Sequence, residues 1–208
     1  MTEEVPEELE KKLNKQSVIF LVVCVIVFAL ILFFLVFGLK KPEFKPNIVE
    51  YNYYNFEEVG GLWQTNIQLD KQLFEAIFRF NPKQVENVSI VGNFTGFRTS
   101  PIYITFDPDV NSDKFKYLAL AASELSLHVV RALNFTVEAA CTKNETDACL
   151  NRPIVTCADD ASVIYLLAES PMQISLNNSC IVLSGDGFDL LKSVDRLLFQ
   201  WYDIMGKN

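Results

Sequence analysis

The sequence predicts an α+β protein in which one N-terminal transmembrane helix is followed by a mixed sheet packed against two amphipathic helices. Three observations lead to this fold class. Ser17–Leu39 is an apolar stretch of 23 residues without a charge. Two later segments repeat apolar residues every three to four positions, as amphipathic helices do. Short apolar runs bounded by turn residues surround these segments, and such runs are typical of strands.

Ser17–Leu39 has the length of a membrane span. At about 1.5 Å per residue a helix of this length covers roughly 34 Å, while the hydrocarbon core of a bilayer is about 30 Å thick. A cleaved signal peptide has a shorter core and a small-residue cleavage site, and Phe37–Lys41 offers no such site. We therefore expect an uncleaved signal anchor that contacts the lipid bilayer through residues 17–39. Cys24 is interpreted as a small apolar residue of this span, with lipidation as the alternative.

The side of the membrane is indicated by sequons and cysteines. Charge does not decide it, because three lysines precede the span and three follow it closely. Chance pairing of Asn with Ser or Thr predicts about 1.5 Asn-x-Ser/Thr sequons in this composition. The chain has five, and all follow the span, at Asn87, Asn93, Asn134, Asn144 and Asn177. Four of the five cysteines also follow it, an even number that suits an oxidising compartment.

These observations divide the chain into four parts. We expect a cytoplasmic tail over 1–16, the signal anchor over 17–39, a spacer with two prolines over 40–46, and an extracytoplasmic α+β domain over 47–208. The protein is thus expected to be a single-pass protein of the cell membrane with its C-terminal domain outside. Its net charge of -8 excludes nucleic acid as the expected partner, because binding phosphates requires clustered Lys and Arg.

The first half of the domain reads as strands. Ile48–Phe56 is aromatic and extended, and Gly60-Gly61 marks a turn. The following strands are expected at Leu62–Leu69 and Leu73–Phe80, joined at Asp70-Lys71, and at Val88–Val91 and Ile102–Phe106.

The second half begins with a helix. Apolar residues recur at helical spacing, and Ser112 or Asp113 is expected to cap the helix start; the residues are Phe115, Leu118, Ala122, Leu125, Val129 and Leu133. Four apolar runs follow, with a hairpin turn expected at Asn177-Asn178; they are Pro153–Thr156, Val163–Leu167, Met172–Leu176 and Cys180–Leu183. A final amphipathic helix is expected over Phe188–Met205.

Four cysteines after the span admit three disulfide pairings. Proximity favours Cys141 with Cys149, which leaves Cys157 with Cys180. A zinc site is the alternative use of these residues. It is disfavoured, because their spacings contain no C-x₂-C pair.

Oxygen-bearing residues after Ile102–Phe106 suggest a cation site. Asp107, Asp109, Asn111 and Asp113 alternate as the first ligands of a calcium loop do, so Ca²⁺ is the cofactor to consider. Against it, the sixth position is Ser112 instead of Gly and the twelfth is Leu118 instead of Glu. The alternative is a loop that caps the following helix. Asp159 and Asp160 could join Asp107 and Asp109 in a hydrolytic site if the sheet brought the four together.

Other catalytic patterns are weak. The single histidine, His128, has no G-x-S-x-G nucleophile elbow to partner it, and we expect it half-exposed on its helix. Gly185-Asp-Gly187 lacks the further residues of a phosphate loop. An aromatic group is the most plausible recognition surface by composition, with packing in strands as the alternative; it consists of Tyr51, Tyr53, Tyr54, Phe56 and Trp63.

Several segments together resemble a known group of proteins. They are Asn81–Val85, Tyr103–Asp109, Ala140–Lys143, Arg152–Asp160, Cys180–Val182, Val194–Leu198 and Trp201-Tyr202. In these segments the chain is similar to uncharacterised archaeal single-pass membrane proteins with a cysteine-containing extracytoplasmic domain. The resemblance implies an archaeal surface and the same topology, and it implies no activity.

The function expected from the sequence is that of a membrane-anchored surface protein. Its glycosylated, disulfide-linked exterior domain would serve interaction or envelope assembly without catalysis, with a membrane or surface protein as partner. One alternative is an accessory subunit of a larger membrane complex. The other is a membrane-anchored metal-dependent hydrolase that uses the acidic cluster of Asp107, Asp109, Asp159 and Asp160.

Overall fold

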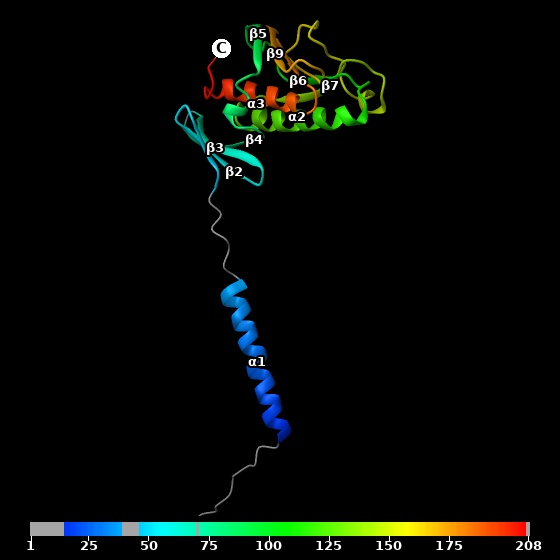
Figure 1. The fold of residues 1–208 in the computed structure, drawn as a ribbon. Helices are drawn as coiled ribbons and strands as arrows, with labels where there is room; N and C mark the ends of the chain where they lie inside the picture. The colour runs from blue at the N-terminus through cyan, green and yellow to red at the C-terminus, as the bar shows by residue number, and fades with distance from the viewer. Residues whose placement is uncertain (1–14, 39–45, 70, 207–208) are drawn as a thin grey trace, which may run out of the picture. The chain divides into compact units, whose positions relative to one another are not determined.

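The computed structural model describes residues 15–38, 46–69 and 71–206, and it divides into two units, 1–45 and 46–208. Residues 1–14 of the expected tail, 39–45 of the expected spacer, and Asp70 lie outside the described residues. In the first unit, α1 (Lys15–Gly38) confirms the N-terminal apolar helix (Figure 1). No side chain of Val18–Leu35 is buried, and this window is long and apolar enough to cross a membrane.

The second unit is α+β, as predicted, but it contains two sheets where one was expected. The first sheet is an antiparallel meander of β1 (Ile48–Tyr51), β2 (Tyr54–Val59), β3 (Leu62–Leu69) and β4 (Gln72–Phe78). The predicted extended segment Ile48–Phe56 is therefore wrong in one respect, because the chain reverses between β1 and β2. Asn52 and Tyr53 form that turn with φ of 42° and 71°.

The second sheet has six strands in the order β5-β9-β10-β8-β6-β7. Its strands are β5 (Ser89–Phe94), β6 (Ile102–Phe106), β7 (Val137–Cys141), β8 (Val163–Leu167), β9 (Gln173–Asn178) and β10 (Cys180–Ser184). β10, β8, β6 and β7 are parallel, and β9 forms an antiparallel hairpin with β10. The sequence pattern missed β7. It also suggested a strand at Pro153–Thr156, where the structure has a loop with one isolated bridge, between Ile154 and Cys141. Short 3-10 turns lie at Pro82–Gln84 and Asp147–Cys149.

Two helices lie between the sheets (Figure 1). α2 (Ser112–Arg131) connects β6 to β7, and its N-cap is Asn111, one residue before the expected position. α3 (Phe188–Trp201) follows β10, and between Leu190 and Phe199 only Lys192 is not buried. This helix is covered on both sides, because it contacts the six-stranded sheet and also packs Phe199 against aromatic rings of β2 and β4.

α3 ends four residues earlier than its apolar pattern predicts. Asp203 adopts a left-handed φ of 55°. The amide of Ile204 then donates to the Phe199 carbonyl at 2.9 Å, and the amide of Asp203 donates to the Gln200 carbonyl at 3.2 Å. These two bonds form a Schellman motif. Ile204 and Met205 are nevertheless buried, because the chain folds back onto the core after the cap.

Two buried polar contacts hold the four-stranded sheet on the helices. Asp195 of α3 accepts hydrogen bonds from the amides of Arg79 and Phe80, at 3.0 and 2.8 Å. His128 of α2 is within 2.9 Å of the Ile77 carbonyl and 2.7 Å of the Tyr202 hydroxyl. The expectation of a half-exposed His128 is therefore wrong: the residue is 5% exposed, because Phe74 and Phe78 of the four-stranded sheet pack against its ring.

The disulfide pairing favoured by proximity is confirmed. Cys141 is bonded to Cys149 and Cys157 to Cys180, with Cα–Cα distances of 6.0 and 5.5 Å. The first bridge closes the loop after β7. The second joins the loop before β8 to the start of β10, and Cys180 packs with Ala140, Val155 and Val163 in a small second core.

Candidate functional site

The parallel strands of the six-stranded sheet bring several charged residues to one edge. β6, β7, β8 and β10 all point the same way, so the residues that follow them lie along the edge formed by their carboxyl ends. In open α/β sheets this edge is the usual place for ligands. Here it carries Asp107 and Asp109 after β6, Lys143 and Glu145 after β7, Glu169 after β8 and Asp186 after β10.

Lys143 is the centre of this cluster. Its Nζ lies 2.9 Å from Asp109 Oδ2, 3.2 Å from Asp107 Oδ1 and 3.7 Å from Glu145 Oε2. The hydrogen bond from Lys143 is the main cause that lowers the pKa of Asp109. A hydrogen bond with Asp109 raises the pKa of Glu145 instead. The two carboxyl groups thus differ in proton affinity, although solvent screens both because about half of each side chain is exposed.

A hollow of about 320 Å³ lies beside this cluster. Asp107, Asp109 and Glu169 line it together with Tyr165 and neighbouring residues of β8. Lys114, in the first turn of α2, donates to the Ala168 carbonyl at 2.8 Å and lies 3.9 Å from Asp186. The site could hold a small polar molecule, and its own lysines already neutralise part of its acidic charge.

The residues of the predicted calcium loop do not converge. Asp107 and Asp109 face the Lys143 ammonium, and Asn111 Oδ1 accepts from the Lys114 amide at 2.9 Å as the cap of α2. Asp113 is within 3.8 Å of the Lys116 ammonium. Among residues 15–38, 46–69 and 71–206, no group of three or more His, Cys, Asp or Glu is arranged to hold a metal ion. Of these four residues, Asn111 caps α2, and the three aspartates each face a lysine.

The four carboxylates of the hydrolase alternative are also separated. Asp159 and Asp160 precede β8, whereas Asp107 and Asp109 follow β6, which is parallel to β8. The two pairs consequently lie at opposite ends of the sheet. Asp159 accepts from the Thr156 amide and hydroxyl at 2.7 and 2.9 Å, and these bonds lower its pKa. Asp160 pairs with Arg98 at 3.5 Å.

The predicted aromatic surface is divided between core and solvent. Phe56 and Trp63 are buried, because both point from the four-stranded sheet towards the helices. Tyr51 and Tyr54 are half-buried against the same core. Only Tyr53, at the β1–β2 turn, is fully exposed. These five residues do not form one recognition surface.

Apolar hollows on the helix layer were not anticipated from the sequence. One of about 200 Å³ lies between α2 and β7, lined by Phe115, Ala119 and Ala139 among others. Periodicity places Phe115 on the buried stripe of α2, but the residue is 42% exposed and lines this hollow. Leu127 and Val130 extend the exposed apolar surface along α2. Another hollow, of about 350 Å³, lies between β5, β9 and α3 beside Trp201.

The five sequon asparagines have one property in common, which is that all are exposed. They lie in the loop before β5 (Asn87), within β5 (Asn93), in the loop after α2 (Asn134), in the loop after β7 (Asn144) and in β9 (Asn177). None lies in the four-stranded sheet or in α2.

Comparison with protein-family models, curated proteins and solved structures finds no match to this chain.

Proposed function

We propose that this protein is a single-pass membrane protein whose residues 47–208 form a glycosylated domain outside the cell, where it serves interaction or envelope assembly without catalysis. The observation that carries the proposal is that two disulfides and five exposed sequon asparagines all follow the apolar helix in the chain. Disulfides persist in oxidising compartments. Sequon glycosylation requires an accessible asparagine in a secreted domain.

An interaction role is supported by the distribution of apolar surface. α2 exposes Phe115, Leu127 and Val130, and exposed apolar surface on a soluble domain commonly marks a contact with another protein. No sequon lies within α2, so no glycan would be attached to this helix.

The proposal is tested by the intact mass of the protein purified from its own membranes, measured with and without reduction before thiol alkylation. We expect added glycan mass, and we expect Cys141, Cys149, Cys157 and Cys180 to react with the alkylating reagent only after reduction. An unmodified mass with these four thiols reactive from the start would overturn the proposal. It would place the domain in a reducing compartment.

Purification in mild detergent distinguishes a surface protein that acts alone from an accessory subunit of a larger membrane complex. A surface protein acting alone elutes as a single component. An accessory subunit co-purifies in fixed ratio with integral membrane proteins and loses them when the detergent becomes harsher.

A further inference from the structure

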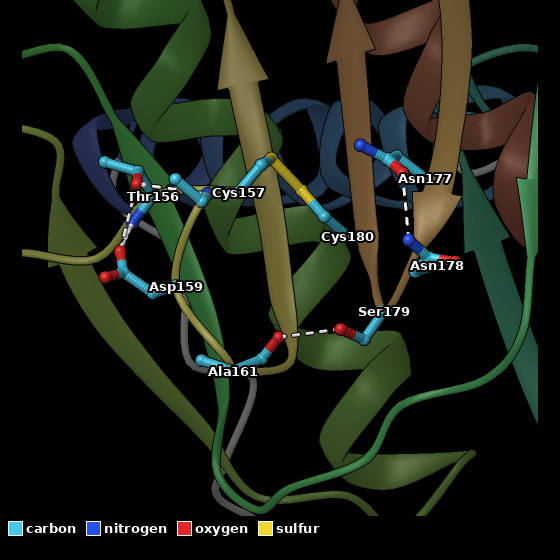
Figure 2. The surroundings of a disulfide bond; sticks show 9 residues. Thr156, Cys157, Asp159, Ala161, Asn177, Asn178, Ser179 and Cys180 are labelled. Carbon is cyan, nitrogen blue, oxygen red and sulfur yellow. Dashed lines mark hydrogen bonds between the residues drawn. A yellow bond between two sulfur atoms is a disulfide. The ribbon is translucent and has the colours of Figure 1, made fainter.

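The sequon at Asn177 occupies an unusual place in the fold. Its three residues form the end of β9 and the turn into β10, with Asn177 as the Cα partner of Cys180. Asn178 adopts a left-handed φ of 54° at that turn. Cys180 is bonded to Cys157, so the sequon lies directly beside a disulfide (Figure 2).

Ser179, the hydroxyl residue of this sequon, is held by the loop that the disulfide closes. Its side chain is 7% exposed, and its Oγ donates to the Ala161 carbonyl at 3.0 Å (Figure 2). Its own carbonyl accepts from the Val163 amide at 3.2 Å. Both partners follow Cys157 closely in the chain. The Cys157–Cys180 bridge therefore fixes the segment that covers the serine.

Burial of this hydroxyl matters because the sequon requires it. Glycosylation is confined to Asn-x-Ser/Thr, which means that the transferring enzyme has to contact the hydroxyl as well as the asparagine amide. Asn177 itself is exposed, but its Oδ1 already accepts from Asn178 Nδ2 at 3.2 Å. An enzyme could reach the hydroxyl only by opening the hairpin against the disulfide.

The other four sequons lack this obstruction. Their hydroxyl residues Ser89, Thr95 and Thr136 are exposed, and Thr146 is half-buried. The sharpest comparison is Asn93, which is the Cα partner of Asn177 across the β5–β9 pair. Adjacent strands are about 4.8 Å apart, so the two asparagines lie at nearly the same position on the surface. Their sequons differ in how accessible the hydroxyl residue is, since Thr95 is exposed and Ser179 is buried.

We propose that closure of the Cys157–Cys180 disulfide shuts the Asn177 sequon, so that Asn93 carries the glycan at this place in the folded domain. This inference rests on the proposed function, since it requires the domain to meet the glycosylation machinery. The transfer joins Asn Nδ2 to C1 of the first sugar and breaks the bond from that C1 to the phosphate of a lipid-linked oligosaccharide. The lipid phosphate leaves, and the amide loses one proton.

The test is site-resolved glycan occupancy, measured by mass spectrometry of peptides from the full chain purified from its own membranes. In the wild type we expect occupancy at Asn177 to be severalfold lower than at Asn93. In Cys157→Ala, which cannot form the bridge, occupancy at Asn177 should rise severalfold. Cys149→Ala is the matched control, because it breaks the other disulfide and should leave occupancy at Asn177 at the low wild-type level.

Each outcome bears on the inference. Equal occupancy of Asn93 and Asn177 in the wild type overturns it, as does modification of other sequons with neither of these two occupied. A rise at Asn177 in both cysteine variants also overturns it, because general loss of structure would then be the cause. Should Cys157→Ala fail to fold, the wild-type comparison decides alone. No glycan at any sequon would instead refute the proposed function.

Discussion

Removal of the Asp195 carboxylate is expected to lower the free energy of unfolding, because it breaks the contact between α3 and the end of the four-stranded sheet. Asp195 is 1% exposed, and one of its oxygens, Oδ2, accepts from the amides of both Arg79 and Phe80. In Asp195→Ala both donors lose their partner. An unpartnered buried donor costs about 1–3 kcal/mol, so we expect the loss of two partners to cost about 2–6 kcal/mol. This is a large share of the roughly 5–15 kcal/mol that stabilises a typical domain.

Asp195→Asn is the matched variant, because its amide oxygen can take both hydrogen bonds without a charge. We expect it to cost no more than about 1 kcal/mol. The assay is urea unfolding of the full chain in detergent micelles with the disulfides intact, followed by tryptophan fluorescence, since Trp63 lies in the four-stranded sheet. Equal destabilisation by Ala and Asn would refute the reasoning, because the amide contacts would then not be the stabilising feature.

Comparison of the wild type with Asp195→Asn also tests the protonation state of Asp195. Burial raises its pKa well above the ordinary value of 3.8, so the folded state retains a proton that the unfolded state releases. The wild type should therefore lose stability as the pH rises from about 4 through the raised pKa, and this loss should be absent in Asp195→Asn. A stability difference between the two that does not change with pH would contradict the assignment.

Three further predictions concern single side chains. His128→Leu should cost about 1–3 kcal/mol at pH 8, because the Ile77 carbonyl and Tyr202 hydroxyl lose a partner. Burial lowers the pKa of His128 below 6.5, so the cost should shrink as the pH falls from about 6.5 through the lowered pKa; a constant cost in urea titrations would contradict this. Tyr53→Gly should raise stability by about 0.5 kcal/mol, since glycine accepts the φ of 71° without strain, and a lower melting temperature would count against it. Lys143→Gln should raise the pKa of Asp109 towards its ordinary value, and an unchanged NMR titration would show that Lys143 does not control it.

Strands with local signals could be predicted from the sequence. The expected bounds of Leu62–Leu69, Ile102–Phe106 and Val163–Leu167 agree with β3, β6 and β8, because each is an apolar or alternating run between turn residues. β7 lacks such a signal. Its sequence Val-Glu-Ala-Ala-Cys contains mainly small residues, and it forms a strand because the crossover through α2 brings it beside β6.

Features that depend on packing between distant segments could not be predicted. The turn at Asn52-Tyr53 has no glycine to mark it, and Tyr53 adopts the left-handed conformation nevertheless. Burial of His128 depends on the four-stranded sheet, whose strands end more than 30 residues before α2 begins. The partner of Asp107 and Asp109 is Lys143, and only the parallel pairing of β6 with β7 brings these residues together.

The orientation of the chain in the membrane is the central claim, and it is tested most directly by labelling intact cells with a membrane-impermeant reagent for lysine. Peptide mapping then reports which lysines reacted. Lys83 and Lys116 are exposed in the domain, whereas Lys11 and Lys12 precede the span. Our account predicts label on Lys83 and Lys116 and none on Lys11 and Lys12. Label on Lys11 and Lys12 with the domain unreacted would contradict it.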